Sequence, residues 1–201
     1  MRRLFLCAMA LGLAVAGTAQ ARQSDHSRLM MGHFQTLCAD NNGDGAKAIQ
    51  LARSADWAPI PAQVFQQEGS PFDDVTAYMN AEEGELMSML LVGTLTETYE
   101  GVAVTMPVCA TLLGDMGAPE DAVLATDLQM VVRDWLGMTP LRSFSDEGME
   151  AFGFTLQEGA RRGLSSDAAA MQAMLNGRLH VIATKREDGM AMVMYMRARL
   201  N

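Results

Sequence analysis

The chain has 201 residues, of which 15 are Lys or Arg and 24 are Asp or Glu, so its formal net charge is −9 at pH 7. This negative balance argues against nucleic acids and anionic lipid headgroups as partners, because both require a concentrated positive face. Its length suits one domain with a real hydrophobic core.

The first 21 residues have the pattern of a cleavable secretory signal peptide. Arg2 and Arg3 supply a positive start, residues 4–17 are almost all apolar, and the small residue Ala21 ends the segment. The apolar run is shorter than the roughly 20 residues that span a bilayer. We expect cleavage after Ala21 and no stable membrane insertion afterwards. The preference for Arg over Lys is typical of a GC-rich bacterial genome, which predicts a periplasmic location.

Two cysteines remain once the signal peptide, with Cys7, is removed. Cys38 and Cys109 are far apart in sequence, belong to no C-x-x-C motif, and have no His or Lys beside them. In an oxidising compartment such a pair is most simply a structural disulfide. We therefore predict a Cys38–Cys109 bridge within a single domain of residues 22–201.

The predicted elements of this domain begin with two helices. The first runs to about Cys38, with apolar residues at helical spacing, and the second spans about residues 45–55, before the prolines at 59 and 61. Residues 64–85 are polar and without a sustained period, so a long surface loop is expected there.

Strands and helices alternate over the remaining residues. The pattern predicts a hairpin of residues 86–97 and 102–113, a helix from Pro119 to Gly137, a strand at 149–156, a helix at 168–175 capped by Asp167, and a last hairpin of 179–185 and 190–200. We therefore predict an α+β fold, in which an N-terminal αα-hairpin and further helices pack on an antiparallel sheet of about five strands.

Methionine is unusually frequent, with 18 residues. Met190, Met192, Met194 and Met196 alternate, so on a strand their thioethers share one face, as do those of Met87 and Met89 earlier in the chain. Soft thioethers, with His180 from the neighbouring strand, are suitable ligands for Cu(I). The simpler interpretation is core packing, because methionine fills irregular gaps.

Asp40, Asn42 and Asp44, followed by Gly45, match the first half of a calcium-binding EF-hand loop. The twelfth position, which should supply a bidentate glutamate, is Leu51. A turn in which Asp44 caps the second helix is therefore the favoured interpretation.

No catalytic motif is present, whether G-x-S-x-G, H-E-x-x-H, a P-loop or a dinucleotide-binding G-x-G-x-x-G, and no cofactor is predicted. The order Phe34-x-x-x-Cys38, Gly43-Asp44, Trp57, Cys109 and Trp135-Leu136-Gly137 resembles small exported disulfide-containing proteins of unknown function from proteobacteria. This resemblance implies a disulfide scaffold and carries over no catalytic or binding residues.

The leading expectation is a non-catalytic periplasmic domain that binds an envelope protein or a small ligand. Two alternatives stay open: a copper-binding protein that uses the methionine row, and an envelope hydrolase with a site assembled by the fold.

Overall fold

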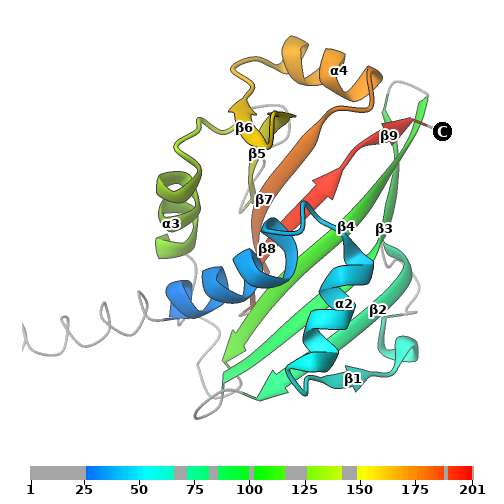
Figure 1. Cartoon of the computed structure of the whole chain (residues 1–201), viewed down its shortest axis with the longest axis vertical. Coiled ribbons are helices and arrows are strands. Elements are labelled where there is room, and N and C mark those ends of the chain that lie inside the picture. The colour runs from blue at the N-terminus through cyan, green and yellow to red at the C-terminus, as the bar shows by residue number, and fades with distance from the viewer. Residues whose placement is uncertain are drawn as a thin grey trace, which may run out of the picture.

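The computed structural model describes residues 26–65, 72–81, 86–99, 102–115, 126–141, 149–187 and 190–200. In this part of the chain, strands form one antiparallel sheet, and helices lie across it (Figure 1). The predicted signal peptide, residues 1–21, lies outside the described residues. Among the helices that are described, none is long and apolar enough to cross a membrane.

Two helices joined by a tight turn open the described chain. A helix over residues 26–34 continues as the π-helical turn η1 (Gln35–Ala39), and α2 (Gly45–Ser54) follows. The carboxylate of Asp44 accepts a hydrogen bond from the Lys47 N–H at 3.2 Å and so caps α2. The polar turn between the helices is therefore explained by capping.

The strands follow in the order in which Figure 1 labels them. They are β1 (Ala58–Ile60), β2 (Phe72–Ala81), β3 (Leu86–Tyr99), β4 (Val102–Asp115), β5 (Met149–Gln157), β6 (Ala160–Gly163), β7 (His180–Glu187), β8 (Met190–Arg197) and β9 (Arg199–Leu200). The order across the sheet is β1-β2-β3-β4-β8-β7-β5-β6, and β9 pairs with β4. A short 3₁₀ turn, η2 (Ala62–Val64), connects β1 toward β2.

Two further helices flank the later strands. Helix α3 (Thr126–Leu136) ends one residue before Gly137, the predicted end, whereas the predicted first turns after Pro119 lie outside the described residues. Helix α4 (Asp167–Leu175) is capped by Ser166, whose hydroxyl accepts from the Ala169 N–H at 3.2 Å, and not by the predicted Asp167.

The prediction of about five strands is wrong, because the described sheet has nine. The patterns that were recognised correspond to β3, β4, β5, β7 and β8, which are consecutive neighbours in the sheet. The predicted loop of residues 64–85 contains β2, and β1 and β6 were also missed.

The missed strands lie at or near the two edges of the sheet, where the alternation of apolar and polar residues is weak. Strand β1 contains Pro59, which has no N–H to donate and is tolerated at an edge. Strand β2 carries an irregularity between Asp73 and Thr76, and Asp74 has a positive φ of 51°. Strand β6 is short and contains two arginines. Edge strands with such residues protect a sheet from pairing with further strands. The same residues interrupt the apolar–polar alternation by which a strand is recognised in a sequence.

Apolar side chains are buried on both faces of the sheet. One core lies under residues 26–54 and α3 and includes Phe34, Phe152 and Tyr195. The other lies on the opposite face, with side chains from α4, and includes Met194 and Met196. Because both faces are buried, the central strands carry apolar residues at successive positions.

The predicted disulfide is present and joins Cys38 of η1 to Cys109 of β4, with their Cα atoms 5.6 Å apart. Both cysteines are fully buried. The bridge attaches the N-terminal helices to a central strand of the sheet and thereby fixes the position of the turn that follows η1.

Candidate functional site

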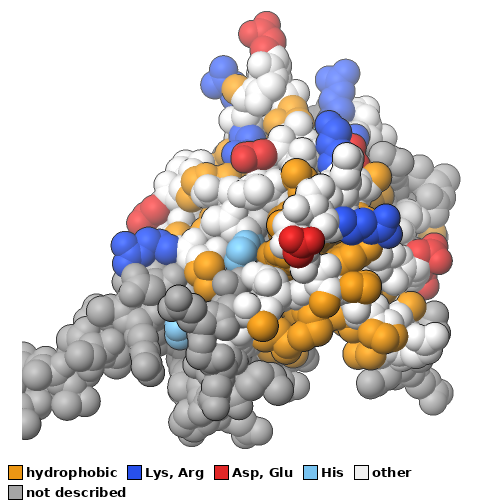
Figure 2. Space-filling view, turned by 60° about the horizontal axis from the view of Figure 1, so that its bottom comes forward, with side chains coloured by type: hydrophobic (Ala, Val, Ile, Leu, Met, Phe, Trp, Pro, Cys, Tyr) orange, Lys and Arg blue, Asp and Glu red, His pale blue; other side chains and the backbone are white. Residues whose placement is uncertain are grey.

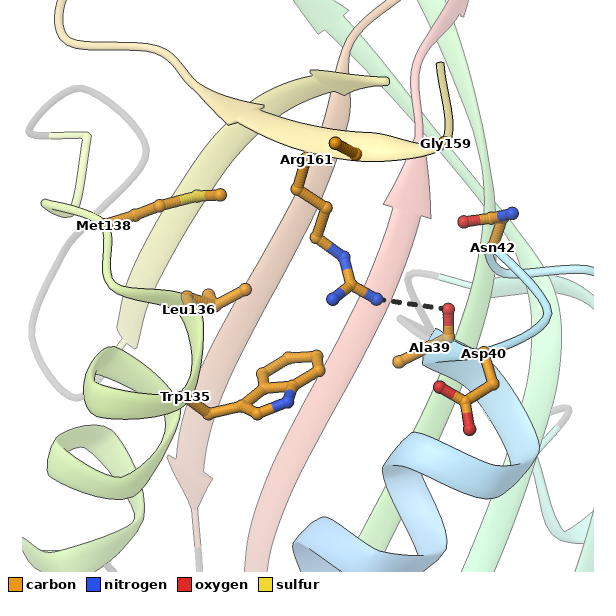
Figure 3. A pocket seen from close by; sticks show the side chains of 9 residues that line it. Ala39, Asp40, Asn42, Trp135, Leu136, Met138, Gly159 and Arg161 are labelled. Atoms are coloured by element: carbon orange, nitrogen blue, oxygen red, sulfur yellow. Dashed lines mark hydrogen bonds between the residues drawn. The ribbon is translucent and has the colours of Figure 1, made fainter. Parts of the chain in front are cut away.

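A cavity of about 440 Å³ lies where the turn after η1 faces the end of α3 and the start of β6. Figure 3 shows its lining residues projecting from these three elements. They are Ala39, Asp40, Asn42, Trp135, Leu136, Met138, Gly159, Ala160 and Arg161. This volume is within the range of small-molecule sites.

The turn that forms one wall of the cavity depends on two residues with a left-handed backbone conformation. Asn42 has a φ of 52° and Gly43 a φ of 72°, a conformation that Asn and Gly adopt most readily. A Cβ on Gly43 would lie 2.5 Å from Cδ1 of Tyr195, so only glycine lets the turn approach the sheet this closely. The Asn41 amide donates to the Thr36 carbonyl at 3.0 Å and helps to end the helix.

The opposite wall is positioned by the tight turn between β5 and β6. Glu158 and Gly159 both have positive φ, at 51° and 79°, as a two-residue hairpin turn requires, and Gln157 pairs with Ala160. Arg161 is therefore the second residue after the turn and pairs with Leu156 on β5. The hairpin fixes the backbone from which this side chain enters the cavity.

Arg161 is held by contacts with three elements. Its Nη2 donates a hydrogen bond to the Ala39 carbonyl at 3.3 Å, and its guanidinium carbon lies 4.7 Å from the ring centre of Trp135 and 5.8 Å from that of Phe154. The carbonyl belongs to the negative end of the first helix, which favours a cation. The guanidinium plane stacks on aromatic faces as a lysine ammonium cannot.

The Nε atom of Arg161 is buried and has no hydrogen-bond partner in the described part of the chain. An unsatisfied buried donor costs about 1–3 kcal/mol, and a charged donor costs more. Asp40 lines the same cavity and is exposed, so the walls carry one positive and one negative group. The arrangement is suited to a ligand that accepts hydrogen bonds from Arg161 without a high negative charge.

A buried pair, Tyr195 and His180, lies on the same face of the sheet as Arg161. Tyr195 Oη and His180 Nδ1 are hydrogen bonded at 2.9 Å, and the His180 ring stacks on Phe154. Burial raises the pKa of Tyr195 to about 12, although Arg161 and Arg197 oppose the shift. Burial and the nearby Arg197 lower the pKa of His180 from 6.5. Both groups are therefore neutral at pH 7, and the Phe154 ring lies against both His180 and the Arg161 guanidinium.

The predicted copper ligands do not form one group. Along β8, Met190 is 37% exposed, Met192 is half-buried, and Met194 and Met196 are 7% and 8% exposed. The four share one face, as predicted, but His180 points to the other face, where it contacts Tyr195. The structure therefore does not bring His180 to the methionine row.

A second concavity, of about 570 Å³, lies between the first helix and α2 and is lined mainly by apolar side chains such as Leu37, Leu51 and Trp57. Figure 2 shows hydrophobic side chains gathered on this end of the molecule, with only scattered charges. Its histidine, His33, packs edge-on against Trp57 at 5.1 Å. Arg28 also lines this concavity. We take the Arg161 cavity as the candidate site because Nε of Arg161 is buried without a hydrogen-bond partner in the described part of the chain.

No group of three or more His, Cys, Asp or Glu side chains in the described ranges is placed to hold a metal ion. Comparison with family models, with curated proteins and with solved structures finds no match for this chain. The resemblance to proteobacterial disulfide proteins remains a prediction.

Sequence reasoning missed Arg161 as a candidate residue and treated Trp135 only as a residue of a helical core pattern. The two are 26 positions apart, and the carbonyl that Arg161 binds is more distant still. One local signal exists, since an arginine pair, Arg161-Arg162, follows the turn-forming Glu158-Gly159 after one alanine. That signal indicates a charged edge strand, and only the fold shows that one arginine of the pair is turned inward.

Proposed function

We propose that this chain is an exported, non-catalytic binding protein of the bacterial periplasm, and that the Arg161 cavity holds a small ligand with a single carboxylate. The observation that carries the proposal is the Arg161 guanidinium, which is oriented by Trp135 and by the Ala39 carbonyl at the edge of a 440 Å³ cavity. Orienting the side chain before binding reduces the entropy that a ligand must offset.

Export and compartment are supported by two observations. Residues 1–21 have the composition of a signal peptide, and Cys38 and Cys109 form a disulfide, a bond typical of oxidising compartments. The choice of a small ligand rests on the concave shape and volume of the cavity. The non-catalytic assignment rests on the sequence, which contains none of the catalytic motifs considered above.

The charge of the ligand follows from Asp40. A carboxylate pairs with a guanidinium through two parallel hydrogen bonds, which gives both energy and orientation. The Asp40 carboxylate on the facing wall of the cavity would repel a doubly charged anion such as phosphate more strongly than a monocarboxylate. The site is therefore expected to prefer monocarboxylates to phosphate.

Thermal unfolding tests this preference with three probes: phenylacetate, phenethylamine and inorganic phosphate. At ten times its dissociation constant, phenylacetate should stabilise the protein by about 1.4 kcal/mol and raise Tm by about 3–6 °C. Phenethylamine and phosphate should leave Tm unchanged. If no carboxylate raises Tm at millimolar concentration, the assignment of the cavity is wrong.

Neighbouring arginines provide a matched pair of variants. Arg161→Gln should abolish the shift caused by phenylacetate, and Arg161→Lys should weaken it because lysine lacks the planar donor fork. Arg162→Gln removes the same charge from an exposed position on the same strand and should retain the full shift. Asp40→Asn should add a response to phosphate. Equal shifts for the Arg161→Gln and Arg162→Gln variants would show that phenylacetate binds elsewhere.

A further inference from the structure

The register of the sheet arranges four methionines around one glycine on the face opposite Arg161. Met87 of β3 pairs with Gly114 of β4, and Gly114 pairs in turn with Met190 of β8. One row further along, Met89 and Met192 flank Leu112 in the same way. Residues paired across strands share a face, so all four thioethers lie on one side of the sheet.

Gly114 leaves an open position between Met87 and Met190. Neighbouring strands are about 4.8 Å apart, so the backbones of Met87 and Met190 are separated by about 10 Å. A Cβ on Gly114 would lie 3.5 Å from Cγ of Met190, which places the Met190 side chain beside the glycine. Methionine side chains have three rotatable bonds and can approach one another across this gap.

Burial separates Met190, at the outer end of its row, from the methionines that fill the core. Met194 and Met196 are 7% and 8% exposed, as expected for core side chains. Met190 is 37% exposed, and Met87, Met89 and Met192 are half-buried. Met89 and Met192 also pack against the core on this face. Core packing explains the inner half of the row but gains little from an exposed thioether at its outer end.

We propose that Met87 and Met190, together with Met89 and Met192, form a thioether site for Cu(I) over Gly114. Thioether sulfur is a soft ligand that selects Cu(I) over hard cations such as Mg²⁺ and Ca²⁺. The ligand set contains sulfur only, because His180 faces the opposite side of the sheet. The site is independent of the Arg161 cavity, and either can exist without the other.

Anaerobic titration of the oxidised protein with Cu(I), in ascorbate and against the chromogenic chelator bicinchoninate, tests the site. The wild type should bind one equivalent and compete with the chelator. The Met87→Leu/Met190→Leu variant should bind at least about tenfold more weakly, since it loses two ligands at little cost in volume. The Met194→Leu/Met196→Leu variant removes two buried methionines of the same row and should bind as the wild type does.

Gly114→Val tests whether the sulfurs converge. This variant keeps every methionine but places a branched side chain in the open position, and valine is well tolerated in a strand. Its affinity for Cu(I) should fall as in the Met87→Leu/Met190→Leu variant, and X-ray absorption of the wild-type complex should show only sulfur ligands. Equal affinity in the wild type and in either of these two variants, or nitrogen in the copper shell, would overturn the proposal, as would a wild type that fails to compete.

Discussion

Replacing both disulfide cysteines by alanine should remove about 4 kcal/mol from the free energy of unfolding. The bridge joins residues 71 positions apart. Closing a loop of that length lowers the conformational entropy of the unfolded chain by about 15 cal/mol/K, which corresponds to about 4 kcal/mol at 25 °C. Both side chains are fully buried, so the packing lost with the two sulfur atoms acts in the same direction.

Urea denaturation followed by tryptophan fluorescence measures this loss. With an m-value of about 2 kcal/mol/M, the midpoint should fall by about 2 M, and m should rise because the unfolded chain is less compact without the bridge. The wild type in the presence of a reductant is the matched control. Because it keeps both buried sulfur atoms, its midpoint should lie below that of the oxidised wild type but above that of Cys38→Ala/Cys109→Ala. A fall of less than about 0.5 M would refute the loop-closure argument.

Two more predictions concern Gly43 and His180. Gly43→Ala should destabilise the protein by about 2–4 kcal/mol in the same urea assay, because Ala at positive φ is strained and its Cβ overlaps Tyr195. Gly177→Ala has a similar φ but no neighbour within 4 Å, so it should cost only about 1–2 kcal/mol, and equal losses would contradict the overlap. The pKa of His180 is lowered in the folded protein, so below about pH 6.5 the unfolded chain binds a proton at this residue that the folded chain does not bind. The free energy of unfolding should therefore fall as the pH is lowered from 7.5 to 5.5. His180→Gln should flatten this slope, and an unchanged slope would show that another group causes it.

The five recognised strands and the two N-terminal helices were predictable because each is stabilised mainly by its own apolar face. In the first helix, Met30, Phe34, Leu37 and Cys38 recur at helical spacing, and all four are buried. In β8, alternation puts Met194 in one core and Tyr195 in the other. A local pattern of apolar residues is sufficient to predict an element wherever burial of those residues is what stabilises it.

Strands β1, β2 and β6 depend on their neighbours, and their sequences show it. Pro59, Asp73, Asp74 and the arginines of β6 are poor strand residues that become acceptable when an adjacent strand supplies the hydrogen bonds. The pairing partner lies elsewhere in the chain. Residues 64–85 by themselves therefore do not indicate that Phe72–Ala81 pairs with β3 and extends the sheet.

The sequence alone determined the disulfide, because removal of the predicted signal peptide leaves Cys38 and Cys109 as the cysteines to be paired, and it placed four methionines of β8 on one face. The tertiary structure decided which groups meet. Arg161 reaches Trp135 and the Ala39 carbonyl through a hairpin turn, and Met87 faces Met190 across Gly114 through strand register. Periodicity along the chain specifies the face on which a side chain lies, whereas contacts between distant residues follow from how the elements pack.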